Sequence, residues 1–136
     1  RRNRLLCDWL GLPARIEWAV GQESDRSIRM SFTGQAFAAA WLEAKQRDGL
    51  HVDQEVWRLD IYPDLATREG FWLLWDALRA RGEKPRVEAG GVTYAWMAKA
   101  KDGSQSIPAQ QGDTPHAALF AAAVALMRRE QEASRG

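Results

Sequence analysis

A short polar run near the start of the last third of the chain holds the side chains that come closest to a catalytic pattern: Asp113, Thr114 and His116. A histidine can act as a general base, and a neighbouring carboxylate can orient its imidazole ring. The base and the orienting residue of a triad seldom lie so close in sequence, however, and the chain contains no Gly-x-Ser-x-Gly nucleophile element. Thr114 is typical of a helix N-cap, and Pro115 fits the first helical position because its missing N–H has no partner there. We therefore predict a capped helix at this place and no catalytic residue.

The single cysteine and the two histidines offer a second possible chemistry. Cys7 would need His51 or His116 as a base, but it lies in an apolar helical pattern, where a lone cysteine packs as a small hydrophobic residue. The three residues are dispersed and have no metal-ligand spacing. Gly90 and Gly91 lack the sequence context of a phosphate-binding loop and read as a turn. The sequence thus predicts no disulfide, no metal, no cofactor and no enzyme.

Length and charge limit the class of protein. The 136 residues suit one domain spanning residues 1–136, and 19 basic against 18 acidic side chains leave a net charge of +1. That balance favours neither a polyanion-coating protein nor an acidic mimic of nucleic acid. No apolar run reaches the roughly 18 residues of a membrane span, and Asp8 follows the arginine-rich start too soon for a signal peptide. We expect a cytoplasmic protein.

Hydrophobic periodicity gives the order of the elements. It predicts helices at 3–10, 35–47, 67–81 and 115–132, strands at 15–20, 27–33, 55–61, 86–89 and 92–100, and a polar connection at 101–112. The order α-ββ-α-β-α-ββ-α indicates an α+β fold, a mixed or antiparallel sheet of about five strands layered with about four helices. The fragments Phe37–Ala40 and Phe120–Ala123 each follow a strand pair, which is compatible with a duplicated ββα unit or with coincidence between alanine-rich helices.

Seven tryptophans are the outlier of the composition. Five of them are in phase with apolar neighbours and are predicted to fill the core: Trp18, Trp41, Trp57, Trp75 and Trp96. Trp9 lies near a helix end and Trp72 near the edge of its helical stripe, so the sequence leaves open whether either is exposed. An exposed tryptophan is a candidate anchor for a partner.

A local excess of positive charge surrounds the junction after residue 78. Its members are Arg79, Arg81, Lys84 and Arg86, with Lys99 and Lys101 at the far end of the following strand. With Trp72, the first four are our candidate partner-binding residues. The alternative is that they are solvated strand ends.

Several motifs between Ile61 and Met127 carry a family resemblance. They are Tyr62-Pro63-Asp64 before a tryptophan-containing helix that ends in Arg81-Gly82, a hairpin centred on Tyr94 and Trp96, and the capped helix start Gly112-Asp113-Thr114-Pro115-His116-Ala117-Ala118. This half of the chain resembles small, uncharacterised phage and prophage proteins of the phage ABA-sandwich type. The resemblance implies a layered fold and a phage-like gene, and it implies no activity. For a phage-encoded protein, the expected cytoplasmic location would be the cytoplasm of the host cell.

The first hypothesis for function is therefore a non-catalytic phage or prophage accessory protein that binds a macromolecular partner; that the partner is a host protein such as a defence component follows from the resemblance alone. The alternative is a nucleic-acid-binding module that uses the basic patch, with Trp72 or Tyr94 as a stacking surface. A third interpretation is a small enzyme without a familiar motif. The identity of the partner and the oligomeric state stay open at this stage.

Overall fold

The structure of the protein is a computed structural model that describes residues 1–22, 29–49 and 54–135. The chain forms two compact units. Unit 1 joins Arg1–Pro13 to Tyr62–Gly136, and unit 2 consists of Ala14–Ile61. Whether both units unfold together, as the sequence prediction of one domain requires, stays a prediction.

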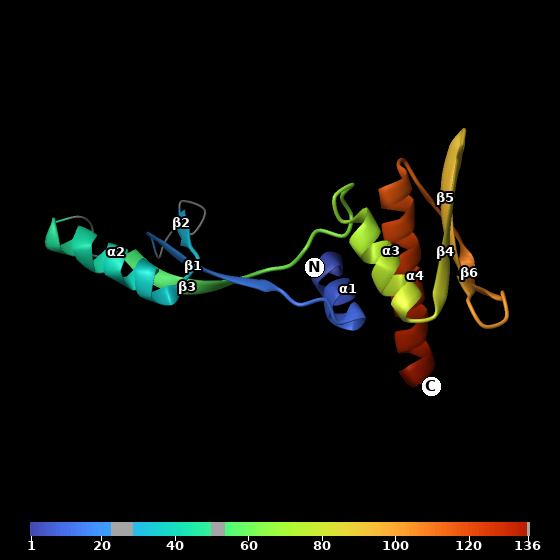
Figure 1. Ribbon diagram of the computed structural model, residues 1–136, viewed down its shortest axis with the longest axis horizontal. Helices are drawn as coiled ribbons and strands as arrows, with labels where there is room; N and C mark the ends of the chain where they lie inside the picture. Colours follow the sequence, from blue (N-terminus) through green and yellow to red (C-terminus); the bar gives the residue numbers. More distant parts are fainter. Residues whose placement is uncertain (23–28, 50–53, 136) are drawn as a thin grey trace. The chain divides into compact units, whose positions relative to one another are not determined.

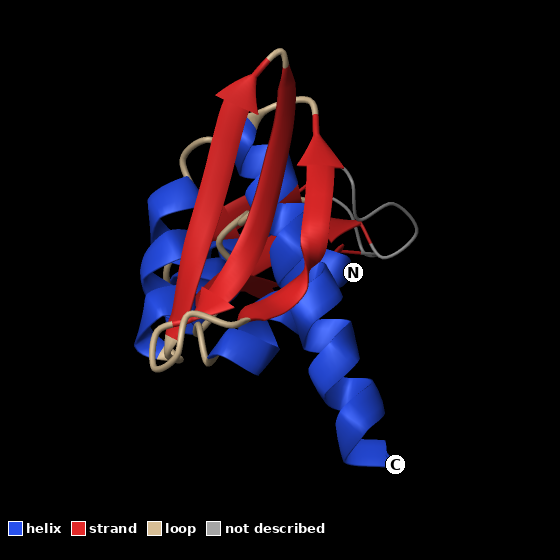
Figure 2. Ribbon diagram, turned by 90° about the vertical axis from the view of Figure 1, so that its right-hand side faces the viewer, coloured by secondary structure: helices blue, strands red, loops and turns tan. Residues whose placement is uncertain are grey.

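Unit 1 is a three-stranded antiparallel sheet with helices on one face. Its elements are α1 (Arg2–Leu10), α3 (Phe71–Ala80), β4 (Glu83–Gly90), β5 (Val92–Lys99), β6 (Gln105–Gly112) and α4 (Pro115–Arg135). The strand order is β4-β5-β6, with α4 across all three strands and α3 beside it on β4 (Figure 1). Figure 2 shows the opposite face of this sheet toward the viewer, with the helices behind. The first helix, α1, packs against α4.

Small residues let α4 approach the sheet closely. Ala118, Ala122 and Ala123 are fully buried, and a Cβ atom at Gly112 would lie 2.4 Å from the backbone nitrogen of Ala118. On β5 the buried side chains are Ala95 and Met97, which face the helices. An apolar cluster drawn entirely from unit 1 results.

The segment before α3 ties α1 to the rest of unit 1. The Asn3 side chain donates from Nδ2 to the Pro63 carbonyl oxygen at 2.8 Å and accepts from the Leu65 backbone N–H at 2.8 Å. Leu65 is itself fully buried in the core. A reciprocal side-chain clamp of this kind satisfies backbone groups that would otherwise lack partners.

Unit 2 contains β1 (Arg15–Gln22), β2 (Arg29–Phe32), α2 (Gln35–Arg47) and β3 (Gln54–Ile61). The sheet order is β2-β1-β3, both pairs are antiparallel, and α2 contacts all three strands. Among the described residues its fully buried hydrophobic side chains are Ala19, Val20 and Ala38. Unit 2 therefore has a much smaller core than unit 1.

The α+β class is confirmed, but the arrangement of strands differs from the prediction. The described residues form six strands in two sheets, because the polar stretch expected as a connection contains β6. This strand is an edge strand, where Pro108 and several glutamines are tolerated because one side of the ladder is unpaired. The sequence predicts a polar loop at 21–26 between the first two strands, but Gly21 and Gln22 belong to β1, and the rest of that stretch lies outside the described residues.

The tryptophans are less buried than predicted. Trp72 is exposed and the other six are half-buried, so none of the five assigned to the core is fully enclosed. Trp96 shows the reason most clearly. Because Ala95 and Met97 face α4, the larger Trp96 lies on the opposite face of the sheet.

Candidate partner-binding site

A tight turn before α3 determines where its aromatic residues lie. The Thr67 backbone N–H and hydroxyl both donate to the Asp64 carbonyl oxygen, at 3.4 and 2.7 Å, and the Gly70 N–H donates to the Thr67 hydroxyl at 3.3 Å. A Cβ atom at Gly70 would lie 2.1 Å from the Asp64 carbonyl oxygen, so only glycine allows this close approach. The helix consequently begins at Phe71 rather than near Thr67, where the sequence predicted its start.

Three aromatic rings follow one another along α3. Ring centroids lie 5.1 Å apart for Phe71 and Trp72, 5.8 Å for Phe71 and Trp75, and 5.9 Å for Trp72 and Trp75. Phe71 and Trp75 pack against the core, whereas Trp72 is 65% exposed. The inner two rings thus hold an exposed indole in place. The structure thus answers the question of Trp72 exposure, which the sequence leaves open.

A hollow of about 410 Å³ adjoins this exposed ring. It lies between the start of α3 and the start of α4 and is lined by Arg68, Phe71, Trp72, Thr114, Pro115 and His116. We call these six residues the Trp72 surface. Trp72 is a site residue predicted from the sequence, but its neighbours are not, because the two helix starts are separated by more than forty positions and only the fold brings them together.

A second hollow, of about 240 Å³, lies at the other end of α3 and is lined by Trp75, Arg79, Lys84, Pro85 and Arg86. The structure thus brings together three of the four predicted basic residues. Among the described residues, none of these three has an ion-pair partner. We call Arg79, Lys84 and Arg86 the basic cluster.

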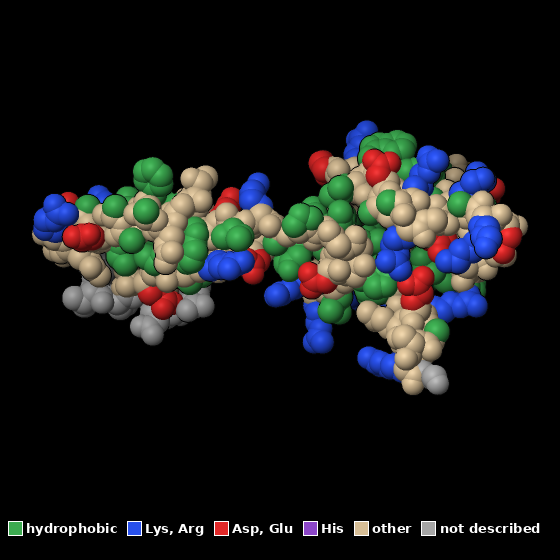
Figure 3. Space-filling view, turned by 60° about the horizontal axis from the view of Figure 1, so that its bottom comes forward, with side chains coloured by type: hydrophobic (Ala, Val, Ile, Leu, Met, Phe, Trp, Pro, Cys, Tyr) green, Lys and Arg blue, Asp and Glu red, His purple; other side chains and the backbone are tan. Residues whose placement is uncertain are grey.

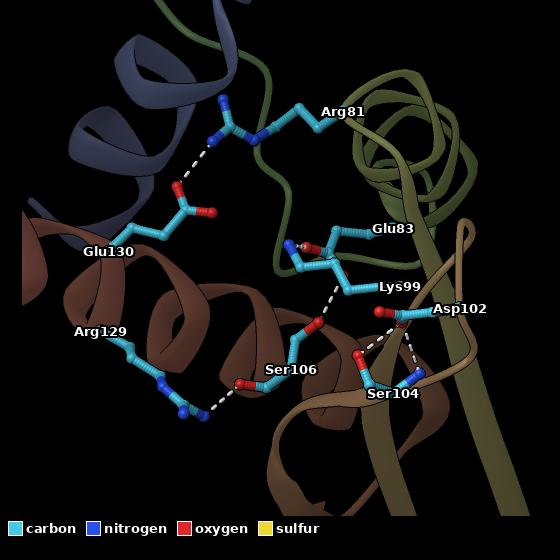
Figure 4. Close-up of polar contacts among 8 residues, drawn as sticks. All are labelled: Arg81, Glu83, Lys99, Asp102, Ser104, Ser106, Arg129 and Glu130. Carbon is cyan, nitrogen blue, oxygen red and sulfur yellow. Dashed lines mark hydrogen bonds and ion pairs between the residues drawn. The ribbon is translucent and has the colours of Figure 1, made fainter.

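Arg81 belongs to a different set of contacts. Its guanidinium pairs with the Glu130 carboxylate at 2.7 Å (Figure 4). The same group lies 3.9 Å from the centroid of the Trp9 ring. These contacts join the end of α3 to α1 and α4. Arg81 is therefore engaged within the molecule, and its role in partner binding stays a prediction. The structure separates the other predicted site residues into two places.

Lys99 is also engaged within the molecule. Glu83 is 2% exposed, and its carboxylate accepts from Lys99 Nζ and, at 2.8 Å, from the Ser106 hydroxyl (Figure 4). Arg129 donates to the Ser106 carbonyl oxygen from α4. A buried carboxylate needs such partners to offset the loss of hydration. The cluster holds the three strands and α4 together at this end of unit 1.

The structure shows where most of the residues weighed as catalytic candidates lie. The Thr114 hydroxyl accepts from the Ala117 N–H at 3.2 Å, which is the predicted N-cap, and His116 lines the Trp72 surface. Burial raises the pKa of the Cys7 thiol, the Asp8 and Asp64 carboxylates raise it further, and the thiol donates to the Pro63 carbonyl oxygen at 3.5 Å. His51 lies outside the described residues. Within the described ranges, no three His, Cys, Asp or Glu side chains are grouped to hold a metal ion.

Charge is unevenly divided between the units. Unit 1 has 13 Lys and Arg residues and 10 Asp and Glu residues, whereas unit 2 has 6 basic and 8 acidic residues. Figure 3 shows Lys and Arg side chains of unit 1 interspersed with acidic and hydrophobic ones on the visible side. Any polyanion would therefore meet a local cluster of positive charge rather than a basic face.

Comparison with known proteins gives no further guide: no family model, no curated protein and no solved structure matches the chain. Across the part of the chain that the structure describes, no helix has both the length and the apolar character required to cross a membrane. The geometry of unit 1 is therefore the basis on which a function can be inferred.

Proposed function

We propose that the protein works without catalysis by binding a protein partner, which docks on the Trp72 surface. The observation that carries this proposal is the 65% exposure of a tryptophan held by two inner aromatic rings beside a hollow of about 410 Å³. Exposing an indole to water is unfavourable, and tryptophan is among the residues enriched in binding hot spots. Burial by a partner would recover that free energy.

The lining of the hollow supports one kind of partner segment. Two aromatic rings and Pro115 provide apolar walls, and Arg68 and His116 provide basic groups, with no acidic side chain in the lining. Arg68 is exposed and has no ion-pair partner among the described residues. These features favour a segment that inserts an apolar side chain next to a carboxylate.

The wider setting of the proposal is a phage or prophage accessory protein whose partner is a host protein such as a defence component. It is supported by the resemblance of residues 61–127 to phage ABA-sandwich proteins, in which Trp72 and the capped start of α4 both lie. The binding proposal does not depend on this setting, because it follows from the exposed ring and its surroundings.

A comparative capture experiment tests the proposal. The parent, Trp72→Ala and Phe37→Ala are each used to capture proteins from a bacterial lysate, with quantitative mass spectrometry as the readout. Phe37 is the matched control because it is a large aromatic residue, 71% exposed, on α2 of unit 2. We expect a specific partner to be retained by the parent and by Phe37→Ala and to be lost with Trp72→Ala.

Kinetics with that partner then separate the roles of the two residue types. Loss of a hot-spot ring costs about 2 kcal/mol or more, so Trp72→Ala should dissociate about 30-fold faster. Arg68→Glu should mainly slow association, because charges at the edge of an interface set the encounter rate. Equal retention of the same proteins by Trp72→Ala, with its melting curve unchanged, would contradict the proposal.

A further inference from the structure

The face of the unit 1 sheet that points away from α3 and α4 presents a second set of aromatic side chains. Ala95 and Met97 of β5 are fully buried against the helices, and successive strand residues point to opposite faces. Tyr94 and Trp96 therefore lie on the other face, where Tyr94 is 39% exposed and Trp96 is half-buried. Figure 2 shows this outer face in front, with α3 and α4 behind it.

Strand register places positive charge next to these rings. Arg86 lies directly opposite Trp96, and Lys84 lies opposite Ala98, so both share the outer face with the aromatic residues. The same two cations line the 240 Å³ hollow at the edge of the sheet together with Arg79, Trp75 and Pro85. The stacking rings and the basic cluster are thus parts of one continuous surface.

Within the described part of the chain, the absence of ion pairs distinguishes these cations from the other basic residues nearby. Arg81 is paired with Glu130 and Lys99 with Glu83, whereas Arg79, Lys84 and Arg86 have no ion-pair partner among the described residues. Three unpaired cations around a hollow with apolar walls are suited to an anion with several charges. One acidic residue, Glu88, lies opposite Tyr94 on the outer face and opposes such a ligand.

From this arrangement we infer that the outer face binds single-stranded nucleic acid, with bases stacked on Tyr94 and Trp96 and backbone phosphates at the basic cluster. Tyr94 and Trp96 are two positions apart on one strand, which separates them by about 7 Å and allows each ring to take one base. Aromatic platforms beside a positively charged groove are the general means of binding single strands. A duplex offers no free base faces to such a platform, so the single strand is the favoured form. This inference is independent of the protein-binding proposal, since it uses the other face of the sheet.

The test uses the full chain and fluorescently labelled oligothymidine and oligouridine of about 12 nucleotides, a length within the range of known single-strand sites. Anisotropy is measured from 50 to 200 mM salt, with a labelled duplex of equal length as the comparison. Three phosphate contacts predict a log–log salt slope of about −2, equivalent to about 20-fold weaker binding over this range. The two oligonucleotides differ in the sugar 2′-hydroxyl and in the 5-methyl group of the base, so a preference would show that one of these groups contributes, and either preference supports the inference.

Variants identify the residues responsible. Trp96→Ala should weaken binding by about 5- to 150-fold, and Trp96→Phe, which keeps an aromatic face, should retain most of it. Arg86→Ala should reduce the magnitude of the salt slope by about 0.7, and Glu88→Gln should strengthen binding. Arg128→Ala, which removes an exposed cation of α4, and Phe37→Ala are the controls for charge and for aromatic loss.

Three results would overturn the inference. They are no binding of either oligonucleotide at 50 mM salt, equal affinity for the duplex, and affinity that Trp96→Ala lowers no more than Phe37→Ala does. If melting curves show that Trp96→Ala unfolds unit 1, the test uses two other variants. The inference then fails if Tyr94→Ala leaves the oligonucleotide affinity unchanged and Arg86→Ala leaves the salt slope unchanged. A protein partner lost on Trp96→Ala, without any oligonucleotide binding, would assign this face to a protein interface.

Discussion

Units 1 and 2 contain the same local arrangement, an antiparallel strand pair followed by a helix. In unit 1 these are β5, β6 and α4, and in unit 2 they are β1, β2 and α2. In both sheets the first strand of the pair is central and a third strand lies on its other side. The third strand comes before the pair in unit 1, as β4, and after the helix in unit 2, as β3.

Burial separates the two units. The helix α4 buries seven residues, whereas Ala38 is the buried residue of α2. The matching fragments show the same contrast, because Phe120 packs against the unit 1 core while Phe37 is 71% exposed. Unit 1 also adds α1 and α3, which enclose the other sides of α4. A similar local sequence pattern thus gives a full core only where further elements cover it.

The largest expected difference between the units concerns their core residues. Leu119 of α4 is fully buried, so Leu119→Ala should reduce the free energy of unfolding of unit 1 by about 2–5 kcal/mol. Phe37→Ala, at an exposed position of α2, should change it by no more than about 0.5 kcal/mol. Urea denaturation of both variants checks this pair. Comparable losses would show that α2 is covered in solution and that the contrast between the units is wrong.

The same comparison shows what the sequence could predict. Periodicity and capping located all four helices, because the apolar stripe and Thr114 of α4 are local features. The periodicity did not predict β6, because its glutamines and Pro108 give no alternating pattern. The sequence predicts that Trp96 faces the core, because large apolar side chains are usually buried. The inward positions of β5 are instead Ala95 and Met97. The alanines of α4 let this helix lie close to the sheet, so little space remains between the two for a large side chain.

The candidate sites depended even more on long-range contacts. Trp72 could be named from the edge of its helical stripe, but Arg68 and His116 become its neighbours only when the starts of α3 and α4 meet. Likewise, the sequence grouped Arg81 with the other cations, and its pairing with Glu130, forty-nine positions away, could not be foreseen. Proximity in sequence located the positive charge but not its partners.

Helix capping provides a smaller difference between the units. Thr114→Ala removes the side-chain cap of α4 and should lower the stability of unit 1 by about 1 kcal/mol. In α2 the N-cap is Gly34, which has an extended backbone and no side-chain cap. Gly34→Ser should therefore stabilise α2 by a few tenths of a kcal/mol, and its Cβ would meet Phe37 at an ordinary 3.5 Å. Melting curves that reverse the signs of these two effects would refute the capping assignments.

The alkaline limit of stability provides a test of the Cys7 environment in unit 1. Folding raises the pKa of this thiol above its ordinary value of 9.0, with burial as the main cause. The folded state therefore keeps a proton that the unfolded state loses, so stability is unaffected below pH 9 and falls as pH rises from there through the folded pKa. A thiol reagent at pH 8 should react slowly with the folded chain and rapidly in urea. Fast labelling of the folded protein would contradict the buried position of Cys7.

The smallest expected effect is on unit 1 when unit 2 is removed. Every member of the unit 1 core cluster lies in residues 1–13 or 62–136, so none of its packing depends on the excised segment. Arg15 and Ile61 are directly paired on neighbouring strands, about 5 Å apart, so the chain enters and leaves unit 2 at adjacent points. A linker of a few glycine and serine residues can therefore join Pro13 to Tyr62.

We expect the resulting protein to unfold cooperatively near the midpoint of the full chain, whereas residues 14–61 alone should lack a sharp transition because their core is too small. Circular dichroism melting and amide spectra of both fragments provide the measurement. If excision unfolds unit 1 as well, the sequence prediction of one cooperative domain is correct and the two units are interdependent.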